Sequence, residues 1–351
     1  METIALPRLM AAKRSYAVRR VNLDECVHLM SDAYAPQAGD LVLARITEIG
    51  SHRRIELPSG RRATLNVGDE VLLAYGNRYA PDQYEAYVPD ALEPCHMVAA
   101  GGIAAKAVSW HDKLSGPTAI EPVGVLCGID GNAVNLKQFA LPTLAGALPS
   151  AVFGVFGTSM NAGKTATAAS LVRGFAKSGY RVGALKITGT AAGGDPWLMQ
   201  DSGAAKVLDF TDGGLATTFG TPIDTIVSTT RNLLRTLNRM DCDLAVVEIA
   251  DGLFQEETRQ VAASPLVQSL FDGVVFASCD ALGAVDGIDR LKGLGYDVLG
   301  LSGAVMRSPL AMREAATHLD VPAYSLEDLQ DAATISDFME KTVSTRLSAA
   351  G

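Results

Sequence analysis

Gly-Thr-Ser-Met-Asn-Ala-Gly-Lys-Thr, at residues 157–165, is the stretch that decides the fold, because it fits the phosphate-loop pattern GxxxxGK(S/T). It directly follows the apolar run 151–156, which has the composition of a buried parallel strand. Residues 165–177 then place apolar side chains at helical spacing. A strand, a glycine-rich turn and a helix in this order predict a nucleotide-binding loop.

Each residue type in this loop has its own chemical use. Gly157 and Gly163 let the backbone curl so that successive N–H groups point inward at phosphate oxygens. Lys164 can reach the β- and γ-phosphates, and the hydroxyl of Thr165 can bind Mg²⁺. The helix that follows adds its N-terminal dipole to the same anion site. The predicted nucleotide-binding residues are Gly157, Thr158, Ser159, Met160, Asn161, Ala162, Gly163, Lys164, Thr165 and Ala166.

Composition limits the possible classes of protein. A chain of 351 residues with 48% hydrophobic residues is long enough for two domains, each with its own core. The net charge of −9 argues against an extended nucleic-acid surface, because such binding depends on neutralising phosphates. No run of apolar residues is long enough to span a membrane, and no secretory pattern opens the chain. We therefore expect a cytoplasmic protein with no membrane partner.

The five cysteines are scattered and include no CxxC pair, so their spacing does not predict a zinc site. Cys279 ends the strand-like run 276–279 and is expected to be a reduced, buried thiol.

Two regimes of sequence meet near residues 141–150, where two prolines and small residues indicate a linker. We expect a β-rich domain at 1–145 and a P-loop NTPase domain at 151–351. Short strand-like runs at 40–49, 54–57, 62–65 and 70–74 predict a small antiparallel barrel, and 122–127 with 132–136 predicts a hairpin. After residue 150, strands alternate with helices, which predicts an α/β fold with a mainly parallel sheet covered on both faces.

Ligands of such sheets bind beyond the carboxyl ends of the strands. Lys186 ends the strand-like run 181–187, and its charge could stabilise a transferring phosphoryl group. Glu248 follows the apolar run 244–247, where a carboxylate can bind Mg²⁺. Asp251 could share that role or orient a nucleophile. The Gly-rich segment 188–196 is predicted to be a mobile switch or lid rather than a helix or strand.

Together, the phosphate loop, Lys186 before Thr188-Gly189, and the segment 247–253 resemble the P-loop family that contains dethiobiotin synthetase. The likeness to the molybdopterin-guanine-dinucleotide accessory GTPases is weaker. The resemblance covers residues 151 to about 325 and implies an acidic Mg²⁺ ligand in the loop after Lys186, assigned to Asp195 ahead of Asp201. It also implies a homodimer. Ile187, Ile249 and Asp251 depart from the family's pattern, and the N-terminal β-rich module has no counterpart in it.

The leading hypothesis is an Mg²⁺-dependent ATP-binding enzyme of kinase or synthetase (ligase) type. It would transfer or hydrolyse the γ-phosphoryl group on a small-molecule or conjugated substrate. Its catalytic residues would be Lys164, Lys186 and Asp251, and its metal ligands Thr165, Asp195 and Glu248. ATP is preferred over GTP because the chain lacks an Asn-Lys-x-Asp segment.

Two other hypotheses stay open. In the first, the protein is a nucleotide-dependent switch or metallochaperone-like NTPase, whose residues 188–204 rearrange and are read by a protein partner. In the second, it phosphorylates polynucleotide 5′-hydroxyl groups, against which the acidic net charge counts.

Overall fold

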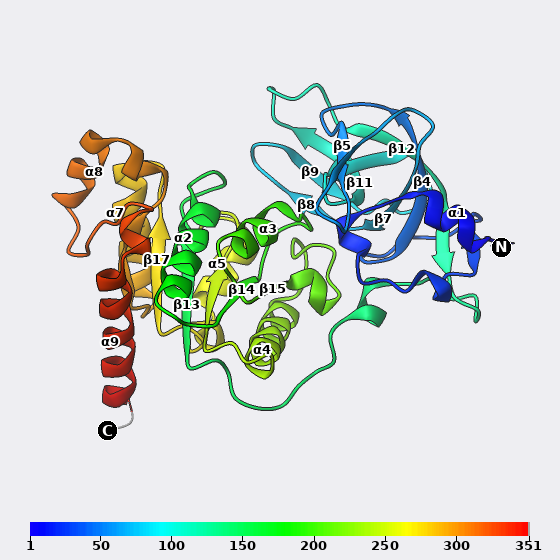
Figure 1. Cartoon of the computed structure of the whole chain (residues 1–351). Helices are drawn as coiled ribbons and strands as arrows, with labels where there is room; N and C mark the ends of the chain where they lie inside the picture. Colours follow the sequence, from blue (N-terminus) through cyan, green and yellow to red (C-terminus); the bar gives the residue numbers. More distant parts are fainter. Residues whose placement is uncertain (350–351) are drawn as a thin grey trace. The chain divides into compact units, whose positions relative to one another are not determined.

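The computed structural model describes residues 1–349, with side chains described through residue 342, and its chain forms two compact units (Figure 1). The first unit comprises Met1–Pro142 together with two later segments, Thr190–Gly194 and Phe210–Gly220. The second comprises Thr143–Gly189, Asp195–Asp209 and Thr221–Gly351, of which residues 350–351 lie outside the described part.

The first unit is built on a mixed β-sheet whose central strands pair in a ring. From β12 the pairing runs through β4, β7, β11 and β10 and returns to β12, so the sheet closes into a small barrel. The strands of this unit are β1 (Glu2–Thr3), β2 (Lys13–Arg14), β3 (His28–Met30), β4 (Leu41–Glu48), β5 (Arg54–Glu56), β6 (Arg62–Thr64), β7 (Glu70–Tyr75), β8 (Arg78–Tyr79), β9 (Tyr84–Tyr87), β10 (Cys95–Ala99), β11 (Ile103–Trp110) and β12 (Thr118–Cys127); its helix is α1 (Leu6–Ala11).

The spacing of the strands predicts a purely antiparallel barrel, and the structure corrects this prediction. β11 and β2 both pair with β7 in parallel. These pairings join segments about 30 and 60 residues apart in sequence, so no local turn signal could indicate their direction. The predicted hairpin is confirmed in part. Ala133 forms an antiparallel bridge with Cys127 at the end of β12, but residues 132–136 form isolated bridges rather than a strand.

The second unit contains a six-stranded parallel sheet in the order β15-β14-β16-β13-β17-β18. Its strands are β13 (Ala151–Gly157), β14 (Val182–Lys186), β15 (Lys206–Asp209), β16 (Leu244–Glu248), β17 (Gly273–Ala277) and β18 (Val298–Ser302). Its helices are α2 (Lys164–Lys177), α3 (Gly194–Asp201, whose first residue belongs to the first unit), α4 (Ile223–Arg239), α5 (Glu256–Ala263), α6 (Pro265–Gln268), α7 (Ala281–Gly293), α8 (Pro309–Ala316) and α9 (Ala332–Ala349).

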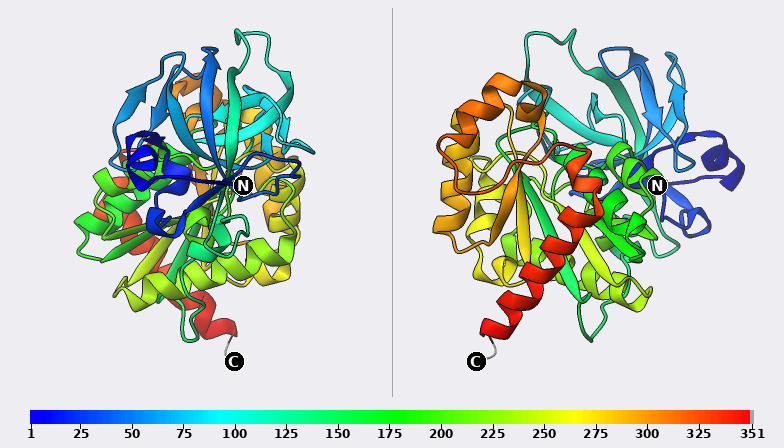
Figure 2. Two further views of the ribbon diagram at one scale, coloured as in Figure 1. Left: turned by 90° about the vertical axis from the view of Figure 1, so that its right-hand side faces the viewer. Right: turned by 60° about the vertical axis from the view of Figure 1, so that its left-hand side comes forward.

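Helices cover both faces of this sheet. On one face Phe153 of β13 stacks on Phe175 of α2 at a centroid distance of 4.9 Å and lies 6.2 Å from Phe338 of α9. In the right-hand view of Figure 2, α9 (red) crosses in front of the strands. On the other face, α7 packs so closely that a Cβ on Gly287 would lie 2.1 Å from the ring of Phe276. This arrangement is the predicted fold of a P-loop NTPase.

The carboxyl ends of the strands carry the predicted site residues at one edge of the sheet. In register, Lys186 of β14 lies beside Glu248 of β16, and Val155 of β13 lies on the other side of Glu248. The phosphate loop therefore begins two residues beyond the level of Glu248. None of the described helices is both long and apolar enough to cross a membrane.

Candidate functional site

The phosphate loop connects β13 to α2 through backbone conformations that few residues adopt. Asn161 has φ 64° and Gly163 has φ 93°, both in the left-handed region. A Cβ on Gly163 would lie 2.9 Å from the Cα of Gly303, and one on Gly157 would lie 2.8 Å from the carbonyl oxygen of Ala277. The two glycines of the motif are thus required by close packing against the end of β17 and the residue that follows β18.

Lys164 is the first residue of α2 and points back into this loop. Its Nζ donates a hydrogen bond to the carbonyl oxygen of Ser159 at 2.6 Å, and the residue is 6% exposed. Burial lowers the pKa of Lys164, while Glu248 and Asp251 oppose that shift. A buried ammonium held against the loop backbone is placed where a bound phosphate would gain most from its charge.

The hydroxyl of Thr165 donates a hydrogen bond to Oε1 of Glu248 at 2.9 Å. The other oxygen of Glu248, Oε2, is buried and accepts no hydrogen bond within the described part of the chain. Burying a carboxylate oxygen without a partner is costly unless a cation or donor serves it. A threonine hydroxyl beside an unsatisfied carboxylate oxygen fits the oxygen ligands that Mg²⁺ prefers.

Lys186 lies between the two acidic candidates. It forms an ion pair with Asp195, and its Nζ is 3.9 Å from Oε1 of Glu248. Burial opposes the charge on Lys186, but Asp195 and Glu248 outweigh it, so the pKa of Lys186 is raised. The structure therefore joins Thr165, Lys186, Asp195 and Glu248 in one cluster.

The two carboxyl groups of this cluster respond differently to their surroundings. Burial would raise the pKa of Asp195, but the charge of Lys186 outweighs burial and lowers it. Burial dominates at Glu248, whose pKa is raised even though Lys186 acts in the opposite direction. Asp195 is thus the better anion of the two, and Glu248 is the carboxylate that an added cation would stabilise more.

The two alternatives for the acidic residue after Lys186 lie at opposite ends of α3. Asp195 is in the first turn, where it meets Lys186, whereas Asp201 is exposed at the last residue of the helix. Residues 188–196 had been predicted to form neither helix nor strand, but α3 begins at Gly194. The short segment Thr190–Gly194 before it packs in the first unit.

Asp251 lies in the loop after β16 with φ 59°, a left-handed conformation that is uncommon for a residue with a side chain. The loop is held on both sides of it. The N–H of Ala250 donates to the hydroxyl of Thr188 at 2.8 Å, and a Cβ on Gly252 would lie 2.0 Å from the carbonyl oxygen of Thr158. Asp251 contributes to the electrostatics of both Lys164 and Lys186, so it belongs to the same site.

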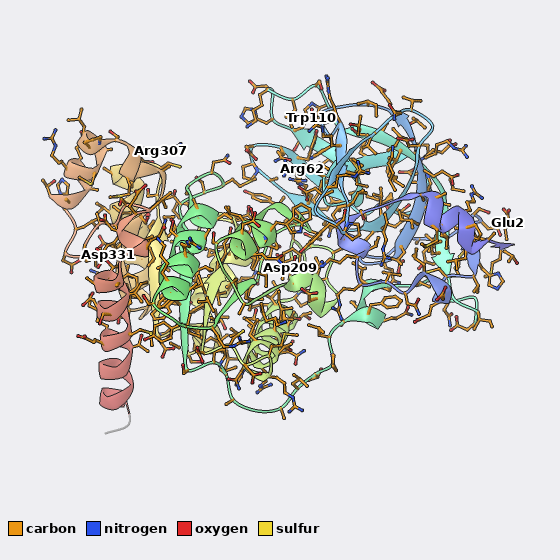
Figure 3. All side chains as sticks on the ribbon, in the orientation of Figure 1. Glu2, Arg62, Trp110, Asp209, Arg307 and Asp331 are labelled. Carbon is orange, nitrogen blue, oxygen red and sulfur yellow. The ribbon has the colours of Figure 1, made fainter. Side chains whose placement is uncertain are left out.

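The sequence did not predict the roles of two residues at this end of the sheet. Thr188 is 1% exposed and fixes the loop that carries Asp251. Asp209, labelled in Figure 3, ends β15 opposite Lys186 in the β14–β15 register and is 2% exposed. Asp209 was not predicted because its strand is too short to show a clear apolar pattern. Thr188 belongs to the Thr188-Gly189 pair that follows Lys186, but the sequence did not predict its hydrogen bond to the loop that carries Asp251.

The prediction that Cys279 is buried is wrong. The residue is exposed, and its Sγ lies 4.0 Å from the hydroxyl oxygen of Ser159 in the phosphate loop. The buried strand β17 ends at Ala277, so Cys279 lies beyond it on the edge where ligands bind.

Within the described residues, no group of three or more His, Cys, Asp or Glu side chains converges as a preformed metal centre. A cation here would instead be held by Thr165, Glu248 and Asp195 together with oxygens of a bound nucleotide, as is usual for Mg²⁺.

No protein-family model matches this chain, and no curated protein matches it. Solved structures that resemble it include the signal recognition particle receptor FtsY from Elizabethkingia anophelis, at 14% identity over 56% of this chain and 67% of that chain, with a TM-score of 0.39. Another is the signal recognition particle 54 kDa protein from Aeropyrum pernix K1 in complex with GDP, at 15% identity over 58% of this chain and 51% of that chain, with a TM-score of 0.39.

A third is the kinase domain of the Escherichia coli tyrosine kinase ETK, at 16% identity over 43% of this chain and 66% of that chain, with a TM-score of 0.33. This chain spans about half the length of the Aeropyrum protein. The roles of the site residues come from the geometry described above.

Proposed function

We propose that this protein is an Mg²⁺-dependent ATP-binding enzyme of kinase or synthetase type, which transfers the γ-phosphoryl group to an oxygen of a small-molecule or conjugated substrate. The observation that carries the proposal is the presence of two lysines at one site, one of them buried and the other 11% exposed. Lys164 is held by the loop backbone, and Lys186 is held between two carboxylates, Glu248 at the end of β16 and Asp195 in the first turn of α3. Phosphoryl transfer is mostly positioning and charge stabilisation, which two fixed cations supply.

The residues divide the work by their position. The loop 157–166 binds the nucleotide's phosphates, with Lys164 at the β- and γ-phosphates. Thr165, Glu248 and Asp195 would hold Mg²⁺, which when bound neutralises charge on the phosphates. Lys186 faces the transferred group. Asp251 is held by its fixed loop to orient the acceptor hydroxyl or take its proton, the role of a general base.

The first test is calorimetric binding of ATP, ADP, GTP and GDP, with and without Mg²⁺. Lys164→Ala is expected to abolish Mg²⁺-dependent ATP binding, whereas Lys177→Ala, an exposed lysine at the other end of α2, leaves it unchanged. Stronger binding of GTP than of ATP would contradict the nucleotide assignment. Absence of binding by the unaltered protein would refute the enzymatic proposal itself.

A second candidate function, a nucleotide-dependent switch that acts on a protein partner, is supported by a separate observation. The chain between Lys186 and Asp195 includes Thr190–Gly194, which is part of the first unit, so a change at the nucleotide's phosphates would reach that unit through the backbone. This hypothesis predicts slow hydrolysis and a partner whose affinity differs between the triphosphate and diphosphate states. Rapid transfer to a small acceptor without any partner would exclude it.

A further inference from the structure

Thr190–Gly194 is anchored in the first unit by several contacts. The N–H of Ala191 donates to the carbonyl oxygen of Ala216 at 3.1 Å, and Thr190 forms an antiparallel bridge with Thr217. Ala191 is fully buried, and a Cβ on Gly101 would lie 2.0 Å from its carbonyl oxygen. The segment that joins two candidate site residues, Lys186 and Asp195, is therefore held along its length.

Glu56, the last residue of β5, supplies the final anchor. Its Oε2 accepts a hydrogen bond from the N–H of Gly193 at 2.8 Å, across 137 residues of sequence. Its Oε1 accepts one from Arg62 at 3.0 Å, and the residue is 3% exposed. Arg62, labelled in Figure 3, belongs to β6, the partner strand of β5.

A buried carboxylate is destabilising unless donors satisfy it, so this pair of donors explains why Glu56 is tolerated in the interior. Arg62 alone would satisfy one oxygen. The second oxygen is available for Gly193, and a hydrogen bond to a charged acceptor is stronger than a neutral one.

The covalent chain carries the effect of this anchor to the nucleotide site. Asp195 is two residues after Gly193, so the Cα atoms of the two residues are at most about 7 Å apart. Asp195 then pairs with Lys186 in the second unit. Fixing Gly193 thus leaves only the bonds between Gly193 and Asp195 free to rotate, so the chain that leads to the Asp195 carboxylate has fewer conformations.

We infer that Glu56 is a positioning residue for the nucleotide site, which acts by holding Gly193 so that Asp195 can take part in binding Mg²⁺. This inference rests on the proposed function. Glu56 itself would touch neither nucleotide nor metal. Its loss would leave the phosphate loop intact but would let the segment before Asp195 adopt many conformations, and ordering that segment would then weaken Mg²⁺ binding.

Three variants test the inference by calorimetric titration of ATP at a series of Mg²⁺ concentrations. Glu56→Ala removes the acceptor and is expected to weaken the apparent Mg²⁺ affinity of the ATP complex by about 5–30-fold, with metal-free ATP binding unchanged. Glu56→Gln keeps an oxygen that accepts from Gly193 and should restore most of that affinity. Glu70→Gln is the matched control, because Glu70 pairs with Arg8 and Arg45 in the same unit but does not contact the segment 190–194.

Hydrogen exchange supplies a readout that does not depend on the variants folding equally well. In the unaltered protein, Mg²⁺ with ATP should slow exchange at 190–201 more than ATP alone does. Unchanged exchange in this segment would overturn the inference, as would equal Mg²⁺ affinity in Glu56→Ala and the unaltered protein. If the unaltered protein binds no ATP at all, the proposed function fails as well; if it binds normally and only Glu56→Ala shows no effect, the positioning role alone is wrong.

Discussion

The ammonium group of Lys186 lies 3.9 Å from Oε1 of Glu248, and the side chains of the two residues are 11% and 2% exposed. Because Lys186 also pairs with Asp195, one lysine balances two acidic groups, one at the end of the adjacent strand β16 and one in the first turn of α3. The same two carboxylates are the proposed Mg²⁺ ligands. Lys186 and Mg²⁺ would therefore share these two carboxylates. Removing the charge of Lys186 should then change how strongly Mg²⁺ stabilises the protein.

Replacing Lys186 with methionine should destabilise the second unit by about 3 kcal/mol without Mg²⁺, because removing one partner of a buried ion pair leaves its carboxylates uncompensated. Added Mg²⁺ should recover part of this loss. The measurement is urea unfolding with and without Mg²⁺. Lys292→Met, which breaks a more exposed pair with Asp320, should leave the free energy of unfolding almost unchanged. An equal loss for Lys186→Met in both conditions would argue against shared carboxylates.

Thr165→Val should reduce the Mg²⁺-dependent affinity for ATP by about tenfold or more, since a hydrogen bond to a charged group is worth about 1.5–3 kcal/mol. The hydroxyl both donates to Glu248 and is the predicted metal ligand. Thr165→Ser keeps the hydroxyl and should bind almost normally. If Thr165→Val and Thr165→Ser bind ATP equally well in calorimetry, the hydroxyl of Thr165 has no role at the site.

Gly252→Ala should disorder the loop that carries Asp251, because the added Cβ would lie 2.0 Å from the backbone oxygen of Thr158. We expect a loss of about 1–3 kcal/mol in stability together with weaker ATP binding. Gly293→Ala is the control, since a Cβ at that helical position meets nothing within 4 Å and should be neutral or stabilising. Thermal unfolding and ATP titration of both variants check the prediction, and similar behaviour of the two would contradict it.

The buried ring of His52 should make the stability of the first unit depend on pH. Burial, helped by the charge of Arg78, lowers the pKa of His52 to about 4. As the pH falls below about 6.5, the unfolded chain takes up a proton that the folded unit does not, so stability is lost between about pH 6.5 and 4. At 1.36 kcal/mol per pH unit, this loss is about 3 kcal/mol.

The measurement is urea unfolding of the protein at pH 7, 6 and 5, followed by a signal from the first unit. His52→Gln should flatten the pH dependence over this range. A variant whose stability falls as steeply as that of the unaltered protein would show that another group is responsible.

The sequence predicts those parts of the fold that local patterns specify. β13, the phosphate loop and α2 follow from one continuous pattern, and the predicted runs 181–187 and 244–247 match β14 and β16 to within one residue at each end. The helix α3 was missed because Gly193 and Gly194 suggested a loop, although Asp195-Pro196 is typical of a first helical turn. The parallel pairing of β11 with β7 depends on contacts distant in sequence and could not be predicted from spacing.

The site shows the same division. Lys186 and Glu248 were predicted because each ends an apolar strand, and parallel strands bring their ends together. The role of Glu56 could not be predicted, because no local sequence pattern indicates that residue 56 contacts residue 193. The exposure of Cys279 was missed because an apolar run does not show where its strand ends.

The first unit is discontinuous along the chain, since Thr190–Gly194 and Phe210–Gly220 complete what Met1–Pro142 begins. The first unit therefore cannot be moved to another protein as one continuous segment of the chain. A recombination event that carried only the first 142 codons would leave Ala191 and Ala216, both buried in the core of this unit, behind in the other parent. Circular permutants or chimaeras of this protein should therefore be joined only where all three pieces of the first unit stay with one partner.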